Sequence, residues 1–217
     1  MTEAIIVFAR EPRLGEVKRR LAAGIGEHAA LFAYRRMSER CLRLAARVAR
    51  ERPACRLQVS IEGRGVGGDT LEARARALGA LVSRQTPGSL GARMLASIRE
   101  AVARGARRAI LLGCDCPSMR MADLRAALDS LVDHDWVLAP TRDGGYWLIG
   151  LREPHARLFH RLPWGQATVA ELTRARARAL ALRGLELPLR EDIDDEAAWR
   201  RWLDHRASSG LPEAEVM

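Results

Sequence analysis

The chain has 217 residues and a formal charge of +9, because 36 basic side chains outnumber 27 acidic ones. Its hydrophobic content of 48% excludes an intrinsically disordered protein. No apolar run reaches the roughly 18 residues of a membrane-spanning helix, and four cysteines are too few for a disulfide scaffold at this length. We therefore expect a cytoplasmic protein with one domain over residues 1–208 and a frayed tail over residues 209–217.

Short apolar runs alternate with amphipathic segments along the whole chain. The pattern predicts strands at residues 4–9, 57–61, 80–83, 109–112, 136–139, 146–151 and 185–187. It predicts helices at residues 27–50, 70–78, 90–104, 121–131, 168–182 and 196–205. This alternation is typical of an α/β three-layer sandwich with a mostly parallel central sheet. Ligands of such sheets bind at the carboxyl ends of the strands, so we expect the site in the loops after strands one, four and five.

The positive charge does not by itself indicate a nucleic-acid partner. The basic residues are arginines spread along predicted helices, with the single exception of Lys18. Tyrosine and phenylalanine, which would stack on bases, are scarce. We therefore expect no nucleic acid as partner, although an anionic small ligand such as a phosphate remains compatible with the charge.

Two glycine-containing loops follow predicted strands. The loop after the first strand carries Arg10 and Gly15 and opens a helix, and Lys18 lies in the first turn of that helix, where an ammonium could meet a phosphate. An ordinary strand–helix connection remains the alternative, because the spacing is not that of a P-loop. Residues 63–68 match G-x-G-x-x-G but follow the second strand, which favours a flexible connector over a dinucleotide site.

Acidic residues follow several of the later strands. Asp115 comes directly after the fourth strand, where it could hold a hard divalent cation or merely cap a turn. Asp143 precedes two glycines, which suits either a plain hairpin or an open floor for a sugar or nucleoside. Asp192 and Asp194 point to one side if their segment is extended, and either could complete a metal site with Asp115.

These signals recur in an order that resembles a bacterial glycosyltransferase-like family, the radical-SAM/selenodomain-associated transferases. That family is related to the nucleotide-diphospho-sugar transferases with the GT-A fold. The resemblance is carried by residues 8–21, 88–94, 113–117, 143–150, 164–165 and 192–194.

The resemblance implies a transferase that uses an activated nucleotide donor, a nucleotide sugar, to glycosylate a small acceptor. It implies Mg²⁺ or Mn²⁺ held by Asp115 with Asp194 or Asp192, and it gives Lys18 and Asp143 catalytic roles. The implied nucleotide-binding residues are Arg10, Gly15, Lys18, Gly88, Gly91 and Arg93. The implied acceptor or sugar residues are Asp143, Gly144, Gly145, Tyr146 and Trp164.

Two other functions remain open on the sequence. The family is also related to the phospholactate guanylyltransferases, so nucleotidyl transfer is an alternative. In that reaction a phosphorylated acceptor attacks the α-phosphate and pyrophosphate leaves. The same scaffold hosts both reactions, so the fold does not separate them. The third possibility is a non-catalytic protein that binds nucleotides or, through its basic surface, nucleic acid.

Overall fold

The structure is a computed structural model that describes residues 2–65 and 70–209. Its strands are β1 (Glu3–Arg10), β2 (Cys55–Glu62), β3 (Leu81–Arg84), β4 (Arg108–Gly113), β5 (Trp136–Pro140), β6 (Tyr146–Leu151) and β7 (Gly184–Glu186). Its α-helices are α1 (Arg19–Ile25), α2 (Glu27–Glu51), α3 (Leu71–Ala77), α4 (Leu90–Ala103), α5 (Met121–Ser130), α6 (Val169–Ala179) and α7 (Glu196–Ser209). A short 3₁₀ helix, η1, spans Ala156–Leu158.

The seven described strands form one sheet in the order β3-β2-β1-β4-β6-β5-β7. Strand β1 pairs in parallel with β2 and β4, and β5 pairs in parallel with β7. Strand β6 is antiparallel to both of its neighbours, β4 and β5. The predicted mostly parallel α/β sheet is therefore confirmed, with β6 reversed because it returns from β5 through a hairpin.

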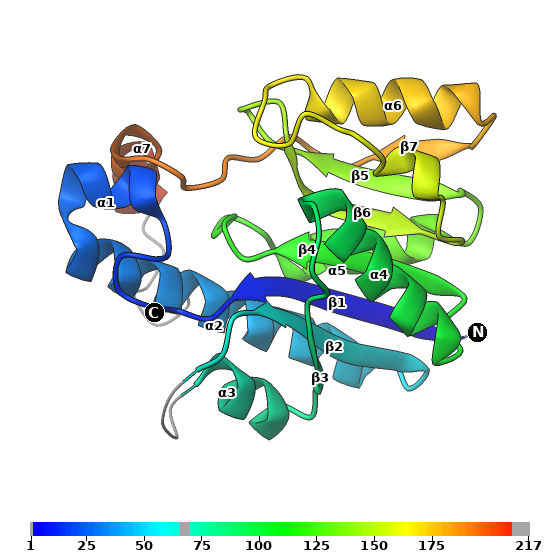
Figure 1. Cartoon of the computed structure of the whole chain (residues 1–217), viewed down its shortest axis with the longest axis horizontal. Coiled ribbons are helices and arrows are strands. Elements are labelled where there is room, and N and C mark those ends of the chain that lie inside the picture. The colour runs from blue at the N-terminus through cyan, green and yellow to red at the C-terminus, as the bar shows by residue number, and fades with distance from the viewer. Residues whose placement is uncertain (1, 66–69, 210–217) are drawn as a thin grey trace.

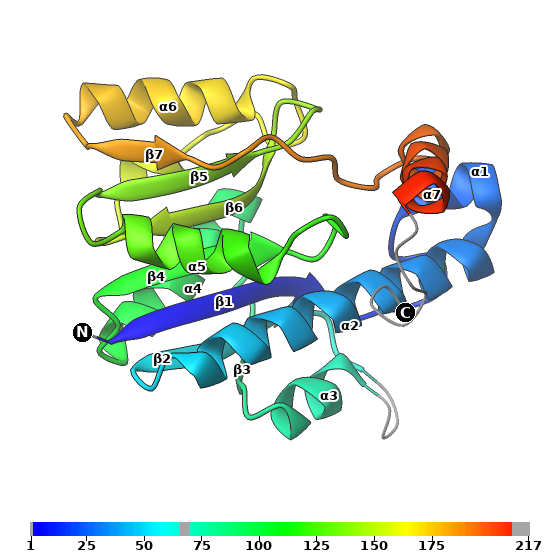
Figure 2. The same ribbon diagram turned by 180° about the vertical axis from the view of Figure 1, so that it is seen from behind.

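Helices cover both faces of the sheet and give three layers (Figures 1 and 2). Helices α2, α3 and α5 pack on one face, where they enclose the larger core cluster, and α4 and α6 pack on the other. The side chains of β1 alternate between these layers, since Ile5 and Val7 join the first core and Ala4 and Ile6 join the second. This burial on both faces explains the continuous apolar character of the strand.

A smaller apolar cluster lies beyond the sheet, where α1, α7 and the start of α2 come together. Leu21, Met37 and Ile193 are buried there, and Trp199 and Trp202 pack against them. Figures 1 and 2 show α1, α7 and the start of α2 past the arrowhead of β1. A long crossing segment joins β7 to α7. This cluster places the segment before α7 across the carboxyl ends of the strands.

Charge pairing stabilises the opposite end of the sheet. Glu3, which is 3% exposed at the start of β1, accepts hydrogen bonds of 2.6 and 2.9 Å from the Arg52 guanidinium. Arg108 Nη2 lies 3.1 Å from the same carboxylate. These contacts neutralise a buried charge that would otherwise be costly.

Three further features bear on the sequence predictions. Residues 66–69, which include the second half of the predicted connector at residues 63–68, lie outside the described residues, as do residues 210–217 of the predicted tail. Lys18 precedes α1 as its N-cap residue in the left-handed conformation (φ 50°, ψ 46°), whereas the sequence predicted it in the first helical turn. Within residues 2–65 and 70–209, no helix combines the length and apolarity that a bilayer crossing requires.

Candidate functional site

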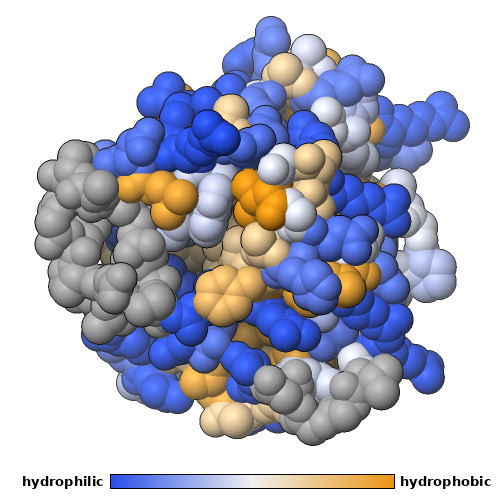
Figure 3. Space-filling model, turned by 90° about the vertical axis from the view of Figure 1, so that its left-hand side faces the viewer, coloured by the Kyte–Doolittle hydropathy of each residue, from blue (hydrophilic) through white to orange (hydrophobic). Residues whose placement is uncertain are grey.

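A large cleft, called here the main cleft, opens at the carboxyl ends of β1 and β4. Its volume is about 770 Å³, within the usual range for small-molecule sites. Its walls also include the hairpin between β5 and β6 and the segment between β7 and α7. Figure 3 faces this end of the molecule, where hydrophilic residues dominate and apolar residues gather near the middle. The site therefore lies where the sheet topology predicted it.

Lys18 lines the main cleft and lies between two carboxylates. Its Nζ atom is 2.9 Å from Asp115 Oδ1 and 2.7 Å from Asp194 Oδ1, and its side chain is only 5% exposed. Burial alone lowers the pKa of the Lys18 ammonium, but the charges of Asp115 and Asp194 outweigh burial and raise the pKa above its usual value. The backbone at Lys18 is left-handed, which is uncommon outside glycine, and Arg161 and Ala181 are the other non-glycine residues described with positive φ.

The segment between β7 and α7 reaches this site through backbone hydrogen bonds. The amide of Ile193 donates to the carbonyl of Asp115 at 2.9 Å, and the amide of Arg142 donates to the carbonyl of Arg190 at 3.1 Å. Ile193 is buried in the apolar cluster of α1 and α7, whereas its neighbours Asp192 and Asp194 line the main cleft. The alternation predicted from the sequence therefore brings both aspartates to the same side.

Asp143, Asp192 and Asp194 form a carboxylate group that could hold a cation. One oxygen from each residue lies within 4.8 Å of the other two. Oxygen ligands of this kind suit Mg²⁺ or Mn²⁺, so the donor set fits the cation that the resemblance implies. Asp115 is not in this group and pairs instead with Lys18.

The local charges shift the acidities of two members of this carboxylate group. Burial, Asp143 and Asp194 together raise the pKa of Asp192 to about 7. Burial would also raise the pKa of Asp194, but Lys18 and Arg20 outweigh it and hold that pKa below its usual value. Asp194 gives one oxygen to Lys18 and the other to Arg20, so a cation would compete with both side chains.

The hairpin between β5 and β6 holds Asp143 in place. Asp143 Oδ1 accepts hydrogen bonds from the Thr141 hydroxyl at 2.6 Å and from the Gly145 amide at 3.0 Å. Gly144 has φ +85°, and a Cβ atom there would lie 1.9 Å from the carbonyl oxygen of Ala167. The plain-hairpin interpretation and the site interpretation are therefore both compatible with this turn, since one aspartate stabilises the turn and faces the cleft.

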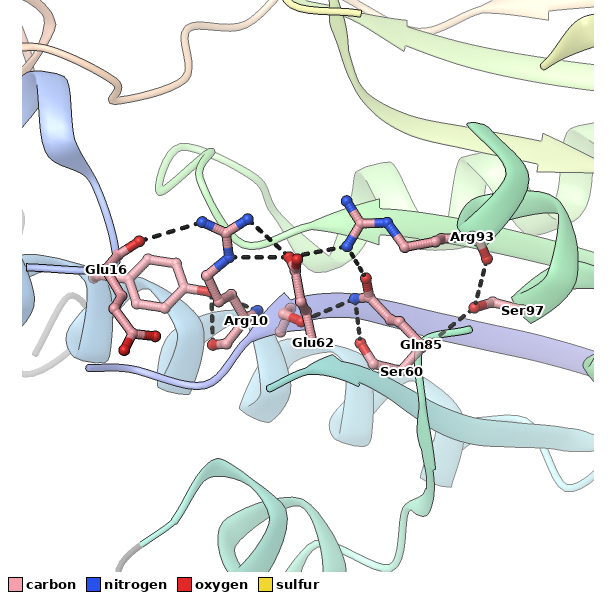
Figure 4. A network of polar contacts seen from close by, with 9 residues as sticks. Arg10, Glu16, Ser60, Glu62, Gln85, Arg93 and Ser97 are labelled. Atoms are coloured by element: carbon pink, nitrogen blue, oxygen red, sulfur yellow. Dashed lines mark hydrogen bonds and ion pairs between the residues drawn. The ribbon is translucent and has the colours of Figure 1, made fainter. Parts of the chain in front are cut away.

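A polar network lines the main cleft near the ends of β1, β2 and β3 (Figure 4). Glu62 Oε2 accepts from Arg10 Nη2 at 2.8 Å and pairs with Arg93 Nη1 at 2.9 Å. Arg93 Nη1 also donates to Gln85 Oε1 at 2.8 Å, and Gln85 Nε2 donates to the carbonyls of Ala9 and Ser60, each at 3.0 Å. Burial would raise the pKa of Glu62, but Arg93 and Arg10 outweigh it and lower that pKa.

Glu62 and Gln85 were missed by the sequence analysis, although Arg10 and Arg93 were predicted. The available signal was position alone: Glu62 ends β2 and Gln85 directly follows β3, at the same edge of the sheet as the loop after β1. Polar residues at the carboxyl ends of adjacent parallel strands meet at one edge, so the topology would have indicated both.

Of the remaining predicted residues, some line the main cleft and others pack behind the residues that line it. Tyr146 and Trp164 line the main cleft, with ring centroids 6.1 Å apart in an edge-to-face contact. Gly91 instead lies in α4 against Trp164 and Phe159, and a Cβ atom there would be 2.4 Å from the Phe159 carbonyl oxygen.

The other predicted glycines differ in how close they come to the site. Gly145 lines the main cleft. Gly15 and Gly88 do not line it, and both have positive φ angles, of 73° and 133°, in the turns before α1 and α4.

Solved structures with this fold include transferases that use nucleotides. A proposed nucleotide-diphospho-sugar transferase from Desulfovibrio desulfuricans G20 is 26% identical, with a TM-score of 0.83 over 96% of this chain and 90% of that chain. A cytidylyltransferase from Leptospira borgpetersenii serovar Hardjo-bovis is 17% identical, with a TM-score of 0.61 over 99% and 90%. A CMP:2-keto-3-deoxy-manno-octonic acid synthetase complexed with CTP is 13% identical, with a TM-score of 0.55 over 96% and 100%.

These likenesses confirm a GT-A-like, nucleotide-diphospho-sugar-transferase type of fold and support a relationship to nucleotide-using transferases. No curated protein matches the sequence. A bacterial family matches residues 45–166, more than half of the chain. The chain therefore belongs to the family described as uncharacterized proteins conserved in bacteria (DUF2064).

Proposed function

We propose that this protein is a transferase that moves a sugar from a nucleotide sugar to a small acceptor. The observation that carries the proposal is the buried Lys18 ammonium between Asp115 and Asp194 at the carboxyl edge of the sheet. A compact ammonium there can move from a carboxylate to a phosphate without leaving the site. The likeness to a proposed nucleotide-diphospho-sugar transferase supports the same assignment.

The donor would extend along the main cleft from the polar network to the aromatic pair. Its nucleoside would lie near Arg10, Glu62 and Arg93, and its diphosphate beside Lys18. The sugar would lie toward Tyr146 and Trp164, which also line the cleft. Aromatic faces of this kind suit the apolar faces of a sugar ring.

The bond changes follow from this placement. An acceptor hydroxyl oxygen forms a bond to the sugar carbon as its proton passes to Asp143. The bond from that carbon to the diphosphate breaks, and its electron pair leaves with the nucleoside diphosphate. Lys18 and Arg20 would stabilise the charge on the leaving diphosphate. Asp143, Asp192 and Asp194 would hold a divalent cation, which supplies further charge neutralisation when bound.

Nucleotidyl transfer is the second candidate. The fold is shared with a cytidylyltransferase and with a synthetase that binds CTP, and Lys18 would be equally well placed beside an α-phosphate. In that reaction a phosphorylated acceptor attacks the α-phosphate and pyrophosphate leaves. The two reactions therefore differ in donor and in leaving group, and both can be measured.

A thermal-shift panel of nucleotide sugars and nucleoside triphosphates, with and without Mn²⁺, tests the proposal. At about 100 times the dissociation constant, a ligand should add roughly 2.7 kcal/mol of stability. Stabilisation by a nucleotide sugar, with release of nucleoside diphosphate on incubation with acceptor mixtures, supports glycosyl transfer. Stabilisation by triphosphates alone, with pyrophosphate release, favours nucleotidyl transfer.

Two variants separate specific binding from general charge. Lys18→Met removes the ammonium that would contact the diphosphate, and it should weaken the shift. Arg99→Ala removes one exposed charge from α4 outside the cleft and should leave the shift unchanged. If no nucleotide stabilises the wild-type protein, both transferase proposals fail and a non-catalytic role gains support.

A further inference from the structure

A second cleft lies on the other side of the carboxylate group. Its volume is about 580 Å³. It is lined by Arg20, Arg142, Asp143, Glu191, Asp192, Asp194, Asp195, Ala198 and Arg201. Arg20 and the three carboxylates of the candidate cation group also line the main cleft. The two clefts therefore share these four residues, and in the proposed reaction the sugar would pass from donor to acceptor beside them.

The walls of the second cleft are fixed by the fold. One wall is the segment before α7, whose Asp195 accepts from the Ala198 amide at 2.8 Å and so caps the helix. The other wall is the hairpin turn, where the Arg142 amide donates to the Arg190 carbonyl at 3.1 Å. Figure 1 shows the crossing segment that joins these walls on its way from β7 to α7.

The lining of the second cleft is almost entirely charged. Ala198 is the one apolar residue among the described residues that line it. Charged groups of both signs surround the cleft, which favours a hydrophilic molecule.

The three arginines of this cleft differ in what they already bind. Arg201 pairs with Glu191 at 2.7 Å, and Arg20 pairs with Asp194. Within the described part of the chain, no ion pair or side-chain hydrogen bond is found for Arg142, which is exposed beside Asp143. Its planar guanidinium can therefore bind both oxygens of one phosphate or carboxylate group.

From this arrangement we propose that the second cleft binds the acceptor, a small hydrophilic molecule whose phosphate or carboxylate group is held by Arg142. The inference that this molecule is an acceptor rests on the proposed transferase function. The binding itself does not, because the second cleft can be occupied whether or not a nucleotide enters the main cleft. With its anionic group at Arg142, the molecule can bring a reacting oxygen to the shared carboxylates.

The electrostatics of the two clefts agree with this division. A nucleotide diphosphate would use Lys18 and Arg20 in the main cleft, which leaves Arg142 and the pair formed by Arg201 for a second anion. Without these arginines, an anionic molecule would be repelled by the carboxylates that it must approach. Arg142 would therefore bind the anionic group of the acceptor and offset part of the repulsion by the carboxylates.

The test uses ligand-observed NMR on the full chain with two probes, glycerol 3-phosphate and glycerate. The first carries a phosphate and the second a carboxylate on a similar polyhydroxyl frame. We expect at least one probe to bind, and to remain bound when Mg²⁺ and a saturating nucleotide are present. Arg142→Ala should weaken that binding on the order of tenfold, whereas Arg99→Ala should leave it unchanged.

The outcomes separate this inference from the transferase proposal. Nucleotide binding that persists in Arg142→Ala while probe binding is lost supports two distinct sites. If the nucleotide displaces the probe competitively, if Arg142→Ala binds the probe as wild type does, or if neither probe binds, the inference is overturned. Failure of nucleotides to bind would remove the transferase function, yet probe binding lost only in Arg142→Ala would still establish the second cleft.

Discussion

Replacing Lys18 with methionine should move the affinities for a divalent cation and for a nucleotide in opposite directions. The Lys18 ammonium is 2.7 Å from Asp194 Oδ1, and Arg20 pairs with the other oxygen of the same carboxylate. A cation bound to Asp194 must therefore displace one of these partners. A hydrogen bond to a charged group contributes about 1.5–3 kcal/mol, so Lys18→Met should tighten Mn²⁺ binding by roughly tenfold to 100-fold in the absence of nucleotide.

The same substitution should weaken nucleotide binding by a similar factor, because the phosphate loses its buried cation. Titration of Mn²⁺ followed by its electron paramagnetic resonance signal gives the first dissociation constant, and calorimetry with a nucleoside diphosphate gives the second. Arg99→Met, an exposed change on α4, is the matched control for loss of one positive charge. Unchanged or weaker Mn²⁺ binding in Lys18→Met would show that Lys18 does not compete for this carboxylate group.

The remaining predictions concern pH and stability. Because the pKa of Asp192 is raised to about 7, ionisation of that residue lowers folding stability as pH rises from about 4 to 7. Mn²⁺ affinity should rise through the upper part of this window as Asp192 releases its proton. Calorimetric titration in two buffers of different ionisation enthalpy measures that proton release. Glu3→Ala leaves Arg108, whose side chain is 11% exposed, without its ion-pair partner, whereas Arg52 keeps Asp129. The change should cost about 3–5 kcal/mol in urea unfolding, and Glu3→Gln should cost less. Gly144→Ala should lower the melting temperature more than Gly165→Ala, because both have positive φ but only Gly144 faces backbone atoms where its Cβ would lie.

Much of the fold could be predicted because the strands are buried on both faces. Continuous apolar runs such as that of β4 allow few other interpretations, and the predicted range of β6 agrees with the structure at both ends. The turn at Asp143 allowed a hairpin, and so the reversal of β6 against β5, as one of its two interpretations. The position of β6 between β5 and β4 could not be predicted, because an antiparallel strand buried on both faces has the same composition as a parallel one. That reversal brings the Asp143 turn to the site.

Many residues that line the main cleft could be predicted from the sequence, but Glu62, Gln85 and the pairings between residues could not. Position after a strand identified Lys18, Asp115 and Asp143, and alternation identified Asp192 and Asp194. Their partners depend on tertiary contacts, chiefly the hydrogen bond from Ile193 to Asp115 and the packing of Ile193 under α1 and α7. These contacts bring Asp192 and Asp194 toward Asp143 and leave Asp115 with Lys18, a division that no local pattern encodes.

A crystal structure of the protein with Mn²⁺ and a nucleotide sugar tests the central claim most directly. We predict that anomalous signal places a manganese ion beside Asp143, Asp192 and Asp194, and that the diphosphate lies beside Lys18 in the main cleft. Manganese held by Asp115 without the carboxylate group would contradict the proposed cation site. A nucleotide bound elsewhere on the molecule would contradict the proposed function itself.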